Sequence, residues 1–229
     1  MGFNCGIVGL PNVGKSTLFN ALTDTAAAEA ANYPFCTIEP NVGRVAVPDT
    51  RLREVFTITG SAQEVPTYLE FVDIAGLVRG ASQGEGLGNQ FLGHIRSVAA
   101  IVHVLRCFDD GNVTHVEETV DPIRDAETVE TELMLADLES LERRIEPLEK
   151  RATSGDKEAK ASLPVMQRTL AALRDGKPAR TVERSDDEAP IFRSLQLITA
   201  KPVLYVCNVD EDSAATGNEF SARVAAMAE

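Results

Sequence analysis

The sequence predicts an α/β fold in which a mostly parallel sheet carries helices on both faces and a pair of long helices interrupts the sheet. Two-sided apolar runs lie at residues 3–8, 69–72 and 101–108, and a run of the same type returns at 203–207. Such runs suit strands that are buried on both faces of a parallel sheet. Helical candidates, notably at 15–22 and 88–97, lie between the runs. This alternation of strand and helix is typical of the α/β class.

The middle of the chain, from about residue 121 to 200, almost lacks strand signal and predicts a helical hairpin. Apolar residues repeat there at steps of four and three, which is the seam of a coiled coil: Met134, Leu138, Leu141, Ile145, Leu148 and Ala152. A second stripe over 159–173 follows a turn-like segment at 153–156. Pro147 and Pro164 lie inside these patterns and are expected to kink or restart the helices.

The hairpin is interpreted as an insertion into one sheet domain, because the strand pattern resumes at Val203. We therefore expect the sheet domain to occupy residues 1–125 and 200–229, with the inserted hairpin at 126–199. A surface pair of helices that merely lengthens a crossover between strands is the alternative. One more helix-like stretch, 218–228, closes the chain, so a final edge strand is expected to be absent.

The composition excludes several classes of protein. The 229 residues contain 22 lysines and arginines against 35 acidic residues, a net charge of −13, which argues against general coating of nucleic acid and against anionic membranes. We expect no sequence-specific DNA binding, and a monomer. No long apolar run and no signal peptide is recognised, and four separated cysteines without a C-x-x-C spacing favour reduced thiols. A cytoplasmic protein is therefore expected.

The strongest motif is GLPNVGKS at residues 9–16, which fits the phosphate-loop pattern G-x-x-x-x-G-K-[ST] between an apolar run and a helical pattern. Its backbone N–H groups and the helix N-terminus can face phosphate oxygens. Lys15 supplies a positive charge for the β and γ phosphates, and the Ser16 hydroxyl is a Mg²⁺ ligand. The fold class therefore narrows to a P-loop NTPase with a Ras-like sheet. The predicted phosphate-binding residues are Asn12, Val13, Gly14, Lys15, Ser16 and Thr17.

Further positions are expected to complete the metal and γ-phosphate site. Asp73 ends an apolar run within a D-x-x-G pattern, where its carboxylate can hold Mg²⁺ through water and the Gly76 N–H can contact the γ phosphate. Thr37 is placed to reach Mg²⁺ from a loop, with an ordinary loop threonine as the alternative. The glycine-rich segment 77–90 is expected to change order with the nucleotide state. The predicted metal ligands are Ser16, Thr37 and Asp73.

The segment NVDE at 208–211 follows the last apolar run, where folds of this kind read the nucleotide base. A guanine site uses N-K-x-D, whose aspartate accepts hydrogen bonds from two guanine donors. Here Val209 replaces the lysine and the longer Glu211 replaces the aspartate. Adenine offers one donor and one acceptor at that edge, so the pattern favours ATP over GTP. Asn208, Val209 and Glu211 are the predicted base contacts, and a GTP-preferring enzyme of the same fold is the alternative.

The chain resembles the YchF/Obg-like ATPases, a branch of the translation-factor class of P-loop GTPases. The resemblance rests on residues 1–9 leading into the phosphate loop, NYPFCTIEPN at 32–41, FVDIAGL at 71–77 with its glycine-rich continuation, and NVDE at 208–211. It extends over all 229 residues, and the insertion corresponds to the helical domain of the family. Members continue into a final strand and a small β-rich TGS domain, and we expect this chain to lack both.

The resemblance implies Mg²⁺-dependent hydrolysis of ATP with unusual catalytic groups. Leu77 takes the place of the glutamine that orients water in Ras-like proteins. The asparagine of related potassium-dependent members maps onto Asn12, whose carbonyl would hold K⁺ beside the β and γ phosphates. A loop histidine proposed for the family matches His115, for which a solvated side chain is the alternative. The catalytic residues expected from motif and resemblance together are Lys15, Thr37, Asn12 and His115.

The expected function is a nucleotide-gated, ribosome-associated ATPase that binds GTP more weakly. A docking protein with negligible intrinsic catalysis is the alternative from another functional class. Residues 143–180 carry ten basic and five acidic residues, which places a basic region on an acidic body. Such a region suits contact with ribosomal RNA at one defined place, although a solvated helix face explains it more simply.

Overall fold

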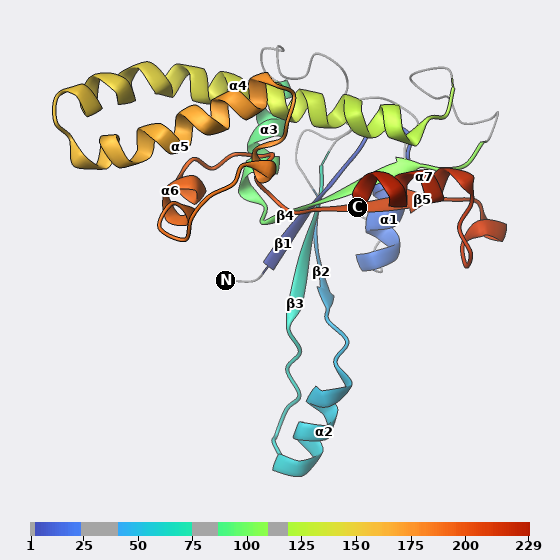
Figure 1. The fold of residues 1–229 in the computed structure, drawn as a ribbon. Coiled ribbons are helices and arrows are strands. Elements are labelled where there is room, and N and C mark those ends of the chain that lie inside the picture. The colour runs from blue at the N-terminus through green and yellow to red at the C-terminus, as the bar shows by residue number, and fades with distance from the viewer. Residues whose placement is uncertain (1–2, 24–40, 75–86, 110–118) are drawn as a thin grey trace.

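The computed structural model describes residues 3–23, 41–74, 87–109 and 119–229, whose arrangement is shown in Figure 1. Within these residues a five-stranded sheet runs in the order β2-β3-β1-β4-β5. Its strands are β1 (Phe3–Val8), β2 (Asn41–Ala46), β3 (Tyr68–Asp73), β4 (Ala100–Arg106) and β5 (Val203–Asn208). The pairs β1–β3, β1–β4 and β4–β5 are parallel, whereas β2 is antiparallel to β3 at one edge. The mostly parallel sheet that the sequence predicts is confirmed.

The described residues also contain seven α-helices. They are α1 (Lys15–Thr23), α2 (Thr50–Thr59), α3 (Leu87–Ser97), α4 (Pro122–Thr153), α5 (Lys157–Arg174), α6 (Ala189–Ser194) and α7 (Glu219–Ala228). Two single 3-10 turns, η1 (Ala179–Thr181) and η2 (Glu211–Ser213), lie in the second half. Helices α1, α3 and α7 match the three short helices expected from the sequence. Of the helices that the structure describes, none has the length and apolar character needed to cross a membrane.

The main hydrophobic core lies around β1 and β4. Ile7 of β1 and Ile101 of β4 are buried together with Phe19 of α1 and Ile95 of α3, so helices pack onto the central strands. β4 is buried at every position except its first. Full burial explains why these strands are continuous apolar runs instead of alternating sequences.

β2 and α2 belong to an arm that was not expected from the sequence. Figure 1 shows α2 at the far end of this arm, away from the other helices. β2 alternates half-buried and exposed residues, which is the pattern of an edge strand with one covered face. α2 begins after the N-cap Asp49 and ends at Gly60, whose φ is 60°. No α2 residue is buried, so the caps rather than packing define this helix.

α4 and α5 form the predicted hairpin, which extends beyond the sheet on one side in Figure 1. Asp121 caps α4 and Asp156 caps α5, each with a carboxylate that accepts backbone N–H groups. Both helices continue through their internal prolines, so neither Pro147 nor Pro164 restarts a helix. The hairpin has its own hydrophobic core, in which buried side chains of α4 and α5 pack with α6.

A buried carboxylate ties the hairpin to the segment that leads into β5. Asp137 of α4 accepts hydrogen bonds from the backbone N–H of Ile198 at 2.9 Å and of Thr199 at 2.7 Å, and from the Thr199 hydroxyl at 2.7 Å. Burial raises the pKa of the Asp137 carboxyl, and the three donors oppose the rise. This contact, which we call the Asp137 latch, fixes the place where the chain re-enters the sheet.

Candidate nucleotide-binding site

The phosphate-loop sequence joins the carboxyl end of β1 to the first residue of α1. Gly9 has a φ of 153°, and a Cβ at this position would lie 2.4 Å from the carbonyl oxygen of Val104. Gly14 has a φ of 97°, and its Cβ would lie 2.4 Å from Nδ2 of Asn208. Both positions therefore require glycine. Asn12 also has a left-handed φ, 61°, which asparagine tolerates better than most residues.

Lys15 is buried at the start of α1 and has a strongly perturbed ammonium group. Its Nζ donates a hydrogen bond to the carbonyl oxygen of Leu10 at 2.7 Å, within the same loop. Burial lowers the pKa of Lys15 to about 8, and the Asp73 charge only partly opposes this effect. The ammonium therefore lacks sufficient negative charge around it. A phosphate group in the loop would supply that charge.

Ser16 and Asp73 meet beside Lys15. The Ser16 hydroxyl donates a hydrogen bond to Oδ2 of Asp73 at 2.8 Å. The contact forms because β1 and β3 are parallel neighbours, with Ile7 opposite Asp73. Burial raises the pKa of Asp73, whereas Ser16 and Lys15 lower it. A hydroxyl and a carboxylate are hard oxygen ligands, and Mg²⁺ commonly takes one or two such protein groups besides phosphates and water, so this pair fits Mg²⁺.

The predicted base segment lies next to the phosphate loop through Asn208. Nδ2 of Asn208 donates a hydrogen bond to the carbonyl oxygen of Val13 at 3.0 Å, so the end of β5 is joined to the loop. Val209 packs against a hydrophobic cluster that includes Val224 of α7. Glu211 is exposed at the start of η2, where its side chain is accessible to a ligand. Of the predicted phosphate contacts, Thr17 is exposed on α1.

Asn218, which is not among the predicted site residues, supports this region. Its side chain accepts a hydrogen bond from the Ser221 N–H and donates one to the carbonyl oxygen of Cys107 at 2.7 Å. The Cys107 N–H in turn donates to the carbonyl oxygen of Asn208 at 2.7 Å. Asn218 thus links the start of α7 to the ends of β4 and β5. The spacing Asn-x-x-Ser, a capping box, is the sequence signal for this role.

The structure therefore brings together the phosphate loop, Asp73 and Asn208, which are far apart in the sequence. The other predicted site residues, Thr37, Gly76 and His115, lie outside the described residues. Their roles stay predictions.

The chain is similar to known proteins over nearly its whole length. A family model described as 50S ribosome-binding GTPase matches residues 4–137. The protein named Ribosome-binding ATPase YchF from Bacillus subtilis is 53% identical over 226 residues, which cover 98% of this chain and 62% of that protein. Its namesake from Haemophilus influenzae is 56% identical over 212 residues, which cover 93% of this chain and 58% of that protein. The chain thus spans about three fifths of these relatives.

A solved structure shows similarity at the level of the fold. The Schizosaccharomyces pombe YchF GTPase aligns with a TM-score of 0.79 at 40% sequence identity. The alignment covers 98% of this chain and 61% of that chain. It therefore includes the inserted hairpin as well as the sheet.

Proposed function

The chain belongs to the family of 50S ribosome-binding GTPases, and we propose that it is a YchF-type member that hydrolyses ATP with Mg²⁺, prefers ATP to GTP, and associates with the ribosome under control of the bound nucleotide. The arrangement of Lys15, Ser16 and Asp73 at the phosphate loop carries this proposal. The relatives' names support it in part, because the bacterial proteins are called ribosome-binding ATPases and the yeast protein a GTPase. The choice of nucleotide is therefore the first property to test.

The proposed reaction transfers the γ-phosphoryl group of ATP to water, and breaks the bond between the γ phosphorus and the β–γ bridging oxygen. Catalysis of this kind relies on positioning and on neutralisation of charge. Lys15 would leave the Leu10 carbonyl and place its ammonium between the β and γ phosphates. The backbone N–H groups at the start of α1 would bind phosphate oxygens.

Ser16 would hold Mg²⁺ directly and Asp73 through water, as their present contact allows. When bound, Mg²⁺ neutralises charge that develops on the β and γ oxygens. On the γ-phosphate side we assign Thr37 to the metal, the Gly76 N–H to a phosphate oxygen, and His115 to the attacking water. Asn12 is the residue proposed to contact K⁺, and comparison of hydrolysis rates in K⁺ and Na⁺ at equal ionic strength tests that role.

Nucleotide preference is expected to depend on Glu211. Excess GTP should displace a fluorescent ATP analogue poorly, because the Glu211 carboxylate is one methylene longer than the aspartate of a guanine site. Glu211→Asp is expected to improve competition by GTP by roughly tenfold, the effect of one regained hydrogen bond. Equal competition by ATP and GTP in the native chain would defeat the proposed preference.

Catalysis and docking are separated by one further measurement. Addition of purified ribosomes should accelerate phosphate release from ATP, because the described site offers no obvious group that activates water. Binding to ribosomes that depends on ATP but leaves hydrolysis unchanged would favour the docking protein instead.

ATP binding is expected to take up protons above neutral pH. The pKa of Lys15 is about 8 in the free protein, and the phosphates should raise it because they favour the charged ammonium. Binding should then take up roughly 0.8 proton at about pH 8.5 and roughly 0.1 proton at about pH 7. Calorimetric titrations in two buffers with different ionisation enthalpies measure this number. An uptake that does not change between the two pH values would contradict the assignment to Lys15.

The basic region of the hairpin is largely paired with acidic side chains. Six of its ten cations lie within 4.0 Å of a carboxylate, in the pairs Arg143–Glu139, Lys150–Glu146, Arg151–Asp156, Arg168–Glu188, Arg174–Glu142 and Arg180–Glu130. Four of these partners lie outside residues 143–180, so counting charges within that segment overstates its positive charge. Lys157 and Lys160, next to the turn between α4 and α5, make no ion pair with a residue that the structure describes. They are the cations that best support contact with ribosomal RNA.

Substitution of both lysines tests the hairpin contact. Lys157→Gln with Lys160→Gln should weaken cosedimentation with ribosomes by roughly tenfold at about 0.1 M salt, because two phosphate contacts would be lost. Arg44→Gln with Arg53→Gln removes the same charge from the arm that carries β2 and α2, and serves as the matched control. Equal losses in both double variants would indicate a general charge effect and no hairpin contact.

A further inference from the structure

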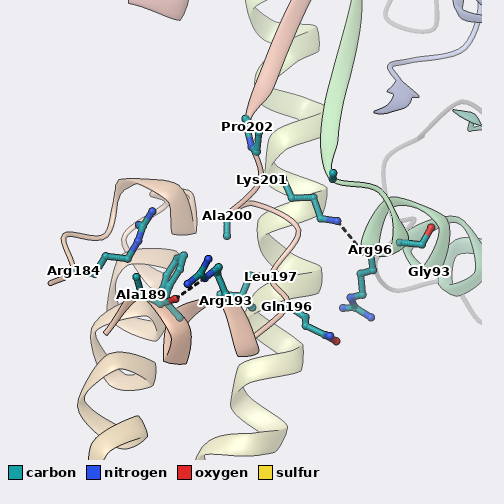
Figure 2. A pocket seen from close by; sticks show the side chains of 13 residues that line it. Gly93, Arg96, Arg184, Ala189, Arg193, Gln196, Leu197, Ala200, Lys201 and Pro202 are labelled. Atoms are coloured by element: carbon teal, nitrogen blue, oxygen red, sulfur yellow. Dashed lines mark hydrogen bonds between the residues drawn. The ribbon is translucent and has the colours of Figure 1, made fainter. Parts of the chain in front are cut away.

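A cavity of about 890 Å³ lies at the amino ends of β4 and β5, at the edge of the sheet opposite the phosphate loop. Its walls come from the end of α3, from α6 and from the segment 196–202. Figure 2 shows Arg96 of α3 and Arg193 of α6 on opposite sides of that segment. We call this cavity the arginine pocket, and the lining residues that matter here are Arg96, Arg184, Phe192, Arg193, Leu197 and Lys201.

Among the residues that the structure describes, every charged side chain that lines the arginine pocket is positive. Arg96, Arg184 and Arg193 make no ion pair with any residue in the described part of the chain, whereas ten other arginines there lie within 4.0 Å of a carboxylate. This is unusual in a protein with 35 acidic and 22 basic residues, where carboxylates are abundant. The pocket therefore concentrates positive charge that no carboxylate of the described residues pairs with directly.

Lys201 adds a fourth positive charge in a fixed place. Its Nζ donates hydrogen bonds to the carbonyl oxygen of Arg96 at 2.7 Å and to that of Val98. Burial lowers the pKa of Lys201, with Asp137 opposing the decrease and the like charge of Arg96 adding to it. The Asp137 carboxylate already accepts the three hydrogen bonds of the Asp137 latch. The Asp137 charge therefore offsets part of the positive charge of the pocket, but its hydrogen bonds go to Ile198 and Thr199 and not to Arg96 or Lys201.

Two of the arginines are held by contacts that leave most of their donors available. Nε of Arg193 donates a hydrogen bond to the carbonyl oxygen of Ala189 at 3.3 Å. One terminal N–H group of Arg184 donates to the carbonyl oxygen of Val182 at 3.1 Å, and its guanidinium carbon lies 4.4 Å from the centre of the Phe192 ring. A guanidinium has five N–H donors, so several remain for a ligand. These contacts reduce the entropy lost when a ligand binds.

We propose that the arginine pocket is a second phosphate-binding site, which takes the phosphate of a nucleotide either within an RNA strand or as a free mononucleotide. Guanidinium groups suit phosphate oxygens because their paired N–H donors match the spacing of two oxygens. An inorganic phosphate would fill only a small part of the volume. Phe192 and Leu197 are buried behind the lining. The less buried Ala189, Ala200 and Pro202 provide the apolar surface for a base or a sugar. The proposal is independent of ATP hydrolysis at the phosphate loop.

Binding of a short fluorescent oligouridylate with a 5′-hydroxyl tests the site, with excess Mg²⁺ and ADP present to occupy the phosphate loop. Arg96→Gln with Arg193→Gln is expected to weaken binding on the order of tenfold at about 0.1 M salt. The slope of log affinity against log salt should fall by about 1.4, because each contacted phosphate in a single strand contributes about 0.7. Both side chains are exposed, so the variant should fold, and its ATP hydrolysis without RNA should match that of the native chain.

The control is again Arg44→Gln with Arg53→Gln, which removes the same charge far from the arginine pocket and should leave affinity and slope unchanged.

Competition between uridine 5′-monophosphate and the oligouridylate distinguishes a free nucleotide from an RNA strand as the source of the phosphate. Competition by the mononucleotide supports a pocket that accepts a free nucleotide, and binding of the oligomer without such competition supports an RNA strand. Native affinity in the Arg96 and Arg193 variant, or no binding by the native chain, would overturn the proposal. Neither result depends on the hydrolysis rate, which tests the proposed ATPase separately.

Discussion

Lys15→Ala is expected to lower the affinity for ATP by about a hundredfold or more and to abolish measurable hydrolysis. The physical reason is that a buried ammonium bonded to phosphate makes charge-assisted hydrogen bonds, whose loss costs roughly 3 kcal/mol in a site that excludes water. The loop itself should survive the substitution. Lys15 makes a hydrogen bond to the Leu10 carbonyl, but its burial also carries a desolvation cost that the variant removes.

Titration with a fluorescent ATP analogue and phosphate release measure the two effects. Lys160→Ala is a suitable control, because it also removes one positive charge, at an exposed lysine of the hairpin. A thermal midpoint close to that of the native chain shows that the Lys15 variant is folded. Hydrolysis of ATP at the native rate by the folded variant would refute the phosphate-loop assignment.

Asp137→Ala is expected to destabilise the protein by about 3 kcal/mol. The substitution leaves two buried N–H groups, those of Ile198 and Thr199, without the carboxylate that accepts their hydrogen bonds, and each such loss costs about 1–3 kcal/mol. The variant no longer buries a charged carboxylate, and this removes a desolvation penalty that offsets part of the destabilisation. Urea unfolding, followed by circular dichroism, measures the free energy.

Asp137→Asn is the matched variant. Its amide keeps one acceptor oxygen at a similar position. Its free energy of unfolding should therefore lie between those of the native chain and the alanine variant. A stability of Asp137→Ala equal to that of the native chain would show that the Asp137 latch does not hold the hairpin to the sheet.

Most of the fold could be predicted from the sequence, because the strands that form the centre of the sheet are buried on both faces. Their continuous apolar runs indicate buried strands even when the neighbouring strands are not known. β2 gives a weaker signal, since its residues alternate between half-buried and exposed. α2 has Leu52, Val55 and Phe56 at helical spacing but buries none of them, and its ten residues are too few for this pattern to stand out. Asp49 and Gly60 nevertheless mark its ends in the sequence. Both elements were therefore missed.

The candidate site also contains features that the sequence predicts and others that it does not. Lys15, Ser16 and Asp73 follow from short motifs, in which a few adjacent residues specify the chemistry. The hydrogen bond between Asn208 and Val13 joins residues 195 positions apart, and it brings Nδ2 of Asn208 close to Gly14. This long-range contact leaves no local pattern, although Gly14 itself belongs to the phosphate-loop motif. The overestimated charge of the hairpin has a related cause, since its acidic partners, such as Glu130 and Glu188, lie outside the segment whose charges were counted.

The Asp137 latch also has a consequence for the order of folding. β4 and β5 pair Ile101 with Val203, so about a hundred residues must be brought into a closed loop before β5 can join β4. The contacts between α4 and α5 are more local along the chain, and local contacts form faster. Once the hairpin exists and Asp137 holds Ile198 and Thr199, the entropic cost of bringing β5 beside β4 falls, because most of the intervening chain is already ordered. The folded insertion then brings β5, and with it Asn208, to the phosphate loop.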